Sequence, residues 1–324
     1  PEARDSVRVA VLQGNIAQGV KWSPEWLERT LGIYEGLTRR AAARGAELVV
    51  WPETALPGHV DAHPALPGRV AARGERLRGR IASLAREVEM TLVVGVVGLS
   101  PGKPGEAPRV HDSAALFGPD GEYLLRYDKT HLVPFGEYLP LRALLARFVT
   151  AIARGSAGVD VSPGPAPRAV PVPLPRTRDL VDVVPTGLPI CYELLFPDLM
   201  RRFAGDGAGL LLAMTNDAWY GRTGAPFQFL AITAMRSAES GLWTARAANT
   251  GVSALIDDRG RVREATWIFE RDLVVGEVPV RPREAGRTFY VRFGDWLPWL
   301  CGAGLAGTAL AGWRRRGARA EDAT

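Results

Sequence analysis

Three short stretches decide how this chain folds, and the first is Leu188-Pro-Ile-Cys-Tyr-Glu193, in which Cys191 follows an apolar run. A second apolar run, Leu48-Val-Val-Trp-Pro-Glu53, ends at Glu53. Between them, Lys129 lies in Tyr127-Asp-Lys-Thr-His-Leu-Val-Pro-Phe-Gly-Glu137. A thiol can attack a carbonyl, a carboxylate can take its proton, and an ammonium can hold the oxyanion. Together the three stretches predict an acyl-transfer site beside strand-like segments.

Strand and helix patterns alternate outward from these stretches. Apolar runs predict strands at residues 7–13, 48–51, 91–99, 210–215 and 272–278, and helical spacing predicts helices at 24–44, 77–88, 196–203 and 228–240. Two hairpins are predicted around glycine-containing turns, with strands at 113–117 and 122–127 and at 251–256 and 261–264. This alternation, with antiparallel hairpins mixed in, predicts an α/β fold with a mixed sheet.

One region breaks the alternation. Six prolines, at positions 163, 165, 167, 171, 173 and 175, predict a long loop over residues 155–178. Just before it, apolar residues at 141, 144, 145, 148, 149 and 152 share one helical face. Two interpretations of that helix stay open: an ordinary core-facing helix, and a mobile lid or lipid-contacting arm.

Composition excludes several classes of protein. The chain has 324 residues, 47% of them hydrophobic, which suffices for one large domain with an appendage or for two domains. Its net charge of +5 comes from arginines scattered among many acids, which favours a solvated surface over nucleic-acid binding. The two cysteines, Cys191 and Cys301, are too few for a disulfide framework, and the absence of a Cys/His cluster predicts no metal site.

The quoted motifs resemble the nitrilase superfamily, whose members use a Glu, a Lys and a Cys in this chain order. They are more similar still to the apolipoprotein N-acyltransferase family, the membrane branch of that superfamily. The resemblance runs from about residue 7 to the C-terminus. It is carried by Trp51-Pro-Glu-Thr-Ala-Leu-Pro57, His131-Leu-Val-Pro-Phe-Gly-Glu-Tyr138, Cys191-Tyr-Glu193, Thr215-Asn-Asp-Ala-Trp-Tyr-Gly221 and Ala248-Asn-Thr-Gly-Val-Ser-Ala254.

The resemblance implies a four-layer α-β-β-α sandwich with mixed sheets and the site at one end of the two sheets. It also implies that Cys191 is the nucleophile, Glu53 the general base and acid, and Lys129 the oxyanion partner. Lysine occurs only at positions 21, 103 and 129 in this arginine-rich chain, which indicates a need for a compact charge at 129. A nearby ammonium is also expected to lower the pKa of the Cys191 thiol.

Further residues are expected around this set. The resemblance implies supporting roles for Glu137, Tyr192 and Glu193. Two aromatic residues, Trp219 and Tyr220, either shape an acyl channel or pack in the core. The family commonly has Asn where this chain has Asp112, and no role is predicted for that position.

The C-terminal stretch from Trp296 to Trp313 carries no charge and precedes Arg314-Arg-Arg316. Its length and flanking residues predict a transmembrane helix with a cytoplasmic C-terminus, against the alternative of a core helix packed through Gly and Ala. The expected domains are a nitrilase-like catalytic domain at 1–290, a transmembrane helix at 291–316 and a cytoplasmic tail at 317–324. The family's N-terminal membrane helices have no counterpart in this sequence.

The function that the resemblance implies is transfer of an acyl chain from a phospholipid to the N-terminal diacylglyceryl-cysteine of an apolipoprotein, through a Cys191 thioester. No cofactor and no metal are expected. The expected location is the bacterial inner membrane, with the catalytic domain on the periplasmic side. A soluble nitrilase-type amidase acting on a small amide or nitrile is the alternative. A catalytically silent binding module is a third class, against which the intact Glu53, Lys129 and Cys191 set argues.

Overall fold

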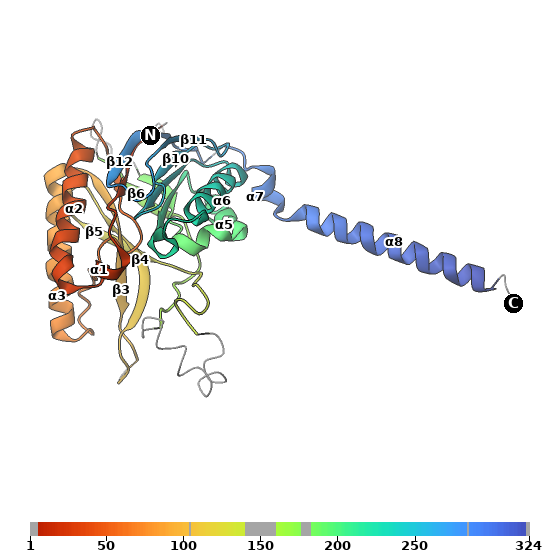
Figure 1. Ribbon diagram of the computed structural model, residues 1–324, viewed down its shortest axis with the longest axis horizontal. Coiled ribbons are helices and arrows are strands. Elements are labelled where there is room, and N and C mark those ends of the chain that lie inside the picture. Colours follow the sequence, from red (N-terminus) through yellow and green to blue (C-terminus); the bar gives the residue numbers. More distant parts are fainter. Residues whose placement is uncertain (1–5, 104, 140–159, 176–182, 284, 322–324) are drawn as a thin grey trace.

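Two six-stranded sheets form the centre of the computed structural model, which describes residues 6–103, 105–139, 160–175, 183–283 and 285–321 (Figure 1). The first sheet has the order β12-β1-β2-β3-β4-β5 and the second β11-β10-β9-β8-β7-β6. The strands of the first sheet are β1 (Ser6–Gln13), β2 (Leu48–Val50), β3 (Thr91–Ser100), β4 (Arg109–Phe117), β5 (Tyr123–Asp128) and β12 (Asp272–Pro279). Those of the second are β6 (Val170–Pro173), β7 (Val183–Gly187), β8 (Leu210–Thr215), β9 (Thr244–Ala248), β10 (Ala254–Ile256) and β11 (Val262–Ala265).

Both sheets are mixed, which confirms the predicted α/β class. In the first, β1, β2 and β3 run parallel and β12, β4 and β5 add antiparallel edges. In the second, β7, β8 and β9 run parallel, with antiparallel β6 and β10–β11 outside them. Strands β2 and β7 each lead towards a candidate catalytic residue.

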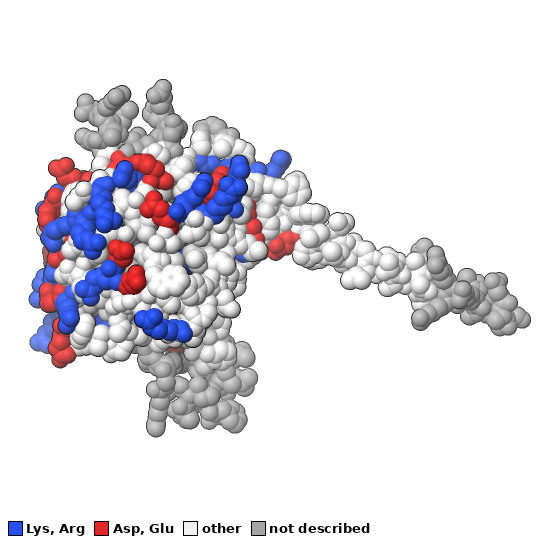
Figure 2. Space-filling model, turned by 45° about the horizontal axis from the view of Figure 1, so that its top comes forward, with Lys and Arg blue, Asp and Glu red and all other residues white. Residues whose placement is uncertain are grey.

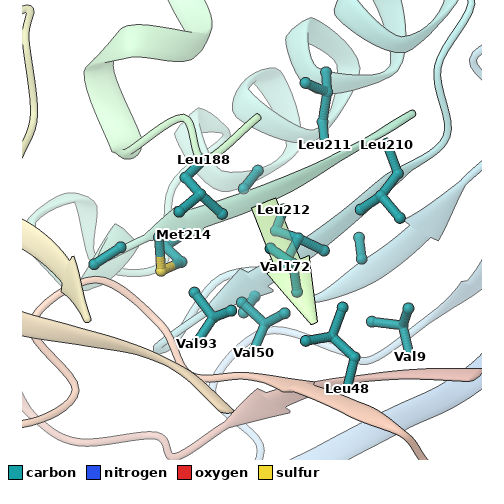
Figure 3. Close-up of a cluster of buried hydrophobic side chains, with 14 of the residues drawn as sticks. Val9, Leu48, Val50, Val93, Val172, Leu188, Leu210, Leu211, Leu212 and Met214 are labelled. Atoms are coloured by element: carbon teal, nitrogen blue, oxygen red, sulfur yellow. The ribbon is translucent and has the colours of Figure 1, made fainter. Parts of the chain in front are cut away.

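The core between the sheets follows from the alternation of side chains along each strand. Val9, Leu48, Val50 and Val93 of the first sheet face residues such as Leu212 of the second (Figure 3). Each fully buried Val or Leu stabilises the fold by about 1.5–3 kcal/mol relative to an exposed one. The inner faces are therefore mainly apolar, and polar groups of the site gather at the strand ends.

Helices cover the two outer faces and complete the predicted four layers (Figure 1). Against the first sheet lie α2 (Pro24–Ala42) and α3 (Gly68–Val88), which bury an apolar cluster with Leu31, Tyr34 and Ile81. Against the second lie α5 (Pro197–Gly205) and α6 (Ala225–Ser240). A four-residue helix, α1 (Gln18–Lys21), precedes α2.

Helix α3 begins earlier than expected, and strands β6 and β9 lie where no strand was predicted. Helix α3 begins at Gly68 rather than at residue 77, because most of its first two turns is solvent-exposed and has no apolar spacing to reveal it. Strand β6 lies inside the predicted proline-rich loop; it is an edge strand, where Pro171 and Pro173 need not donate to a second neighbour. Strand β9 was not predicted, because its sequence, TARAA, has little β-propensity and forms a strand by burial at the centre of its sheet.

The predicted amphipathic helix at 141–152 lies outside the described residues. At the C-terminus, α7 (Phe289–Phe293) is followed by α8 (Trp296–Glu321), which extends away from the sandwich (Figure 1). The predicted helix is thus present. The predicted membrane crossing is not supported, because no helix in the described part of the chain combines the length and the apolar content that crossing a bilayer requires. Eight of the 18 residues from Trp296 to Trp313 are Gly or Ala, which dilute the larger apolar side chains.

Charges on the two-sheet sandwich are mixed in sign. Blue and red side chains are interspersed over the face shown in Figure 2, while the part of α8 that is drawn in white carries none. This distribution agrees with an arginine-rich solvated surface. Exposed apolar side chains are concentrated on α8, where Trp299, Leu305 and Trp313 are each more than two-thirds exposed.

Candidate active site

Glu53 projects from a tight turn that directly follows β2. The turn passes through Thr54 at a φ of 45°, a left-handed conformation that costs free energy for a non-glycine residue. It packs on β3 at Gly95, where a Cβ would lie 2.0 Å from the carbonyl oxygen of Pro52. Glycine is therefore required at 95 for the turn to approach the sheet and hold Glu53 at its edge.

Lys129 directly follows β5, and its N–H donates to the carbonyl oxygen of Asp112 on β4 over 2.8 Å. Its side chain is fully buried. The ammonium Nζ lies 2.6 Å from an oxygen of Glu137, 3.3 Å from one of Asp112 and 3.5 Å from one of Glu53. A single lysine thus compensates three carboxylates.

Cys191 is the first residue of the short helix η1 (Cys191–Leu195), which follows β7. Its φ of 47° places it, like Thr54, in the left-handed region. Only 8% of the residue is exposed, so Cys191 is buried. A strained, buried nucleophile position of this kind is typical of functional sites.

The structure brings Glu53, Lys129 and Cys191 together. Burial, followed by the charge of Glu53, raises the pKa of the Cys191 thiol well above its usual range, and Lys129 opposes this. Burial works against ionisation of Glu53 too, but Lys129, hydrogen bonds from Asp112 and Cys191, and Lys21 outweigh it and lower the pKa of Glu53. Lys129 therefore acts on the thiol pKa in the expected direction, but burial outweighs it and the net shift is upward. Glu53, whose pKa is lowered, lies beside this thiol.

Glu137 and Glu193 occupy distinct positions. Glu137 accepts hydrogen bonds from Lys129 Nζ at 2.6 Å and from the Val133 N–H at 2.9 Å. Glu193 is fully buried and accepts from the Thr130 N–H and hydroxyl, both at 2.7 Å, and from the Ile190 N–H at 2.8 Å. It therefore joins the segment after Lys129 to the turn that carries Cys191.

The three aromatic candidates lie in different surroundings. The Tyr192 ring packs edge-on against Phe196, with centroids 5.1 Å apart. Trp219, on η2 (Asp217–Tyr220), is 69% exposed and so does not pack in the core. Tyr220 stacks on Phe229. Burial, followed by the charge of Cys191, raises the pKa of Tyr220 to about 12, because its hydroxyl lies within electrostatic reach of the thiol.

Sequence reasoning missed two residues of the site. Lys21 is 1% exposed and its Nζ donates to the main-chain carbonyl of Glu53 over 3.1 Å; burial lowers its pKa to about 8. The signal was present, since Lys21 is one of only three lysines in the chain. Asp112, to which no role was assigned, contacts Lys129, and one of its carboxylate oxygens lies within 4.8 Å of one of Glu53.

A second buried ion pair supports the η2 segment. Arg246 on β9 lies 2.8 Å from Asp217, and both side chains are fully buried. Arg246 also donates to the carbonyl oxygen of Val252. A Cβ at Gly251 would lie 1.8 Å from an oxygen of Asp217, so glycine is required there for the two segments to meet.

Carboxylate oxygens of Glu53, Asp112 and Glu137 lie within 4.8 Å of one another, a spacing that a cation could bridge. The ammonium of Lys129 contacts all three carboxylates and supplies that positive charge itself. The arrangement therefore suits proton transfer and oxyanion stabilisation.

A cavity of about 240 Å³ lies elsewhere, lined by residues that include Ala208, Leu242, Arg281 and Arg287. Ala208 and Leu242 precede β8 and β9, whereas Cys191 follows β7, which runs parallel to them. The cavity is thus at the opposite end of the sheet from the candidate catalytic residues, and none of them lines it.

The sequence matches the carbon-nitrogen hydrolase family over residues 8–285. This span holds both sheets and the segments that carry Glu53, Lys129 and Cys191. The chain therefore belongs to the carbon-nitrogen hydrolase family.

Within this family, the chain is similar to apolipoprotein N-acyltransferases, which confirms the resemblance noted in the sequence. It is 39% identical over 317 residues to the protein from Geobacter metallireducens, covering 98% of this chain and 56% of that protein. It is 37% identical over 318 residues to the protein from Azotobacter vinelandii, covering 97% and 55%. The chain spans about half the length of these relatives.

Solved structures support the fold. An amidase from Nesterenkonia sp. AN1, in a form with acrylamide added at its active-site cysteine, matches with a TM-score of 0.57 and 22% identity, covering 90% of this chain and 100% of that one. A carbon-nitrogen hydrolase from Helicobacter pylori matches with a TM-score of 0.58 and 16% identity, covering 84% and 89%. The two-sheet α/β architecture is thus shared with this group.

Proposed function

We propose that this chain is the catalytic part of an apolipoprotein N-acyltransferase, which moves an acyl chain from a phospholipid to the N-terminal diacylglyceryl-cysteine of an apolipoprotein. The observation that carries the proposal is the contact of Glu53 with both Lys129 and Cys191 in a buried site. The names of its relatives supply the substrates. Residues 1–290 would form the catalytic domain.

The reaction would begin when Glu53 removes the proton of the Cys191 thiol. The sulfur attacks the ester carbonyl of the phospholipid, and Lys129 stabilises the oxyanion. As the intermediate collapses, the carbon–oxygen bond breaks, and protonated Glu53 gives its proton to the departing lysophospholipid oxygen. A thioester on Cys191 remains.

The second half would reverse these roles. The amine of the apolipoprotein attacks the thioester carbonyl, Glu53 takes a proton from the amine, and the Cys191 sulfur leaves and is reprotonated. No step needs a cofactor. Water must be excluded while the thioester waits, and the burial of Cys191 and Lys129 provides part of that protection.

Supporting roles in this chemistry would fall to Glu137, Tyr192 and Glu193. Glu137 holds the ammonium of Lys129, and Glu193 holds the backbone on either side of the site. The Tyr192 main-chain amide would add to the oxyanion site. Trp219 and Tyr220, at its open side, would contact the acyl chain.

We further propose that the domain works on the periplasmic side of the bacterial inner membrane, with α8 in contact with lipid. Aromatic side chains of α7 and α8 support this: Phe289 packs on Phe293 and, edge-on, on Trp296, and all three are at least 42% exposed. Exposed aromatic and leucine side chains suit the boundary between lipid and water. Lipid contact in this form requires no crossing of the bilayer by α8.

The test is the intact mass of the chain after incubation with vesicles of one phospholipid of defined acyl chains. A gain equal to that acyl group, mapped to Cys191 and released by an amine-bearing diacylglyceryl peptide, supports the proposal. Exposed Cys301 must be replaced by Ser beforehand, because it is the second thiol in the chain. Hydrolysis of small amides without any thioester from phospholipid would favour the amidase alternative instead.

A further inference from the structure

The charges of the site do not balance if every group is ionised. Three carboxylates, Glu53, Asp112 and Glu137, are gathered around Lys129. Lys21 adds a second ammonium next to the main chain of Glu53. Two positive charges against three negative ones would leave one uncompensated negative charge in a buried site, which is costly in free energy.

Two orphan oxygens mark the place where the imbalance lies. Glu53 Oε2 and Asp112 Oδ1 are buried, and among the described residues neither accepts a hydrogen bond from an N–H or O–H donor. The other oxygen of each carboxylate faces Lys129, Oε1 of Glu53 at 3.5 Å and Oδ2 of Asp112 at 3.3 Å. Two ionised carboxylates cannot serve each other, because both only accept.

We infer that Asp112 carries a proton at Oδ1 and donates it in a hydrogen bond to Glu53 Oε2, so that Asp112 acts as a positioning residue for the carboxylate base. One proton satisfies both orphan oxygens and removes the excess charge. This inference rests on the proposed role of Glu53 as the base.

The proton is assigned to Asp112 on the contacts of its neighbours. Glu137 already accepts from Lys129 and from the Val133 N–H, so both of its oxygens are used. The groups facing Asp112 are Glu53 after β2 and Lys129 and Glu137 after β5, with Lys21 of α1 and Cys191 of η1 also within electrostatic reach. Burial and the charge of Glu53 raise the pKa of Asp112 well above its usual range, whereas the pKa of Glu53 is lowered.

The consequence for chemistry is a base held ionised and oriented by a neutral donor. Loss of the Asp112 proton at high pH would put a second negative charge beside Glu53 and leave Glu53 Oε2 without a hydrogen-bond donor. Thiolate formation at Cys191 would then be opposed, and its reactivity would fall. An asparagine in this position donates from its amide at every pH and cannot lose the donor.

The probe is iodoacetamide, which alkylates the Cys191 sulfur with loss of iodide and therefore needs no lipid substrate. Alkylation of Cys191 is followed by mass in a Cys301→Ser background, across a pH series. Asp112→Ala should slow alkylation by about 10- to 100-fold, the scale of a misplaced catalytic group. Asp112→Asn should restore the rate to within about threefold of the parent at neutral pH and abolish the parent's decline on the alkaline side.

Two controls make the result decisive. Exposed Asp258→Asn should leave the pH profile of the parent intact. An infrared difference spectrum, parent minus Asp112→Asn at neutral pH, should contain the carbonyl stretch of a protonated carboxylic acid. This comparison isolates Asp112 from the other carboxyl groups.

An Asp112→Asn protein as slow as Asp112→Ala, with no acid band in the difference spectrum, would overturn the inference and make an ionised Asp112 the required form. Failure of the proposed function looks different. If alkylation and infrared results are as expected but phospholipid vesicles never acylate Cys191, the role of Asp112 stands and the acyltransferase proposal falls.

Discussion

Replacing Lys129 with Met is the most informative single perturbation of this site, because one fully buried ammonium contacts three carboxyl groups. Methionine keeps much of the volume and removes the charge. Removing one partner of a buried ion pair costs about 3–5 kcal/mol, since the remaining charge is left uncompensated. The loss should be smaller at acid pH, where protonation of a carboxylate relieves the repulsion.

The same change should slow acylation of Cys191 by about 10²–10³-fold, the effect of removing one oxyanion donor. Stability is measured by urea unfolding at neutral and acid pH, and the rate by single-turnover acylation from phospholipid vesicles. Exposed Lys103→Met is the matched control and should change the free energy of unfolding by less than about 0.5 kcal/mol. The reasoning would be refuted by a Lys129→Met protein whose free energy of unfolding lies within about 1 kcal/mol of the parent's and whose acylation rate lies within threefold. A difference of about 1 kcal/mol is what one exposed ion pair contributes at most.

Four further outcomes are expected. Cys191→Ala should fold, as judged by circular dichroism, and should give no acyl adduct with phospholipid; an acylated Cys191→Ala protein would overturn the assignment of Cys191 as the nucleophile. Glu53→Gln should slow single-turnover acylation by about 10²-fold, as expected for loss of a general base, and a rate near that of the parent would remove Glu53 from the mechanism. Because Asp112 binds its proton more tightly when folded than at its ordinary pKa of 3.8, the parent's free energy of unfolding should fall relative to that of Asp112→Asn as pH rises above about 4; parallel pH curves would contradict this. Arg246→Met should cost about 3–5 kcal/mol in urea unfolding by stranding buried Asp217, and the double variant with Asp217→Leu should recover most of it.

The parts of the fold that the sequence predicted are those with strong local patterns. Continuous apolar runs such as residues 91–99 can only be buried, and the strand β3 (Thr91–Ser100) matches that run closely. The missed elements have tertiary causes. Strand β9 holds the fully buried Arg246, which no strand pattern anticipates, and it is stable because Asp217 and the Val252 carbonyl satisfy the guanidinium.

The candidate site was predicted to the same extent and for a related reason. Glu53, Lys129 and Cys191 were found because each sits in a distinctive stretch, and the structure brings them together as expected. Asp112 and Lys21 were not, since their role depends on what surrounds them. A lysine in Gly19-Val-Lys-Trp22 has no local feature to separate it from a solvated one. The net upward shift of the Cys191 pKa was not predicted for the same reason, because burial outweighs the lowering effect of Lys129.

The raised pKa of Cys191 has a consequence for how such a site avoids unwanted chemistry. A preformed thiolate would react with any electrophile that entered, whereas a protonated thiol is a weak nucleophile until its proton leaves. In the proposed mechanism that proton goes to Glu53, whose pKa Lys129 helps to lower. Formation of the thiolate is thus tied to the presence of an electrophile whose developing oxyanion Lys129 can stabilise. Glu193 accepts hydrogen bonds from both Thr130 and Ile190, so it ties the segment that follows Lys129 to the turn that carries Cys191, and loss of either contact would weaken the placement of Lys129 beside the thiol.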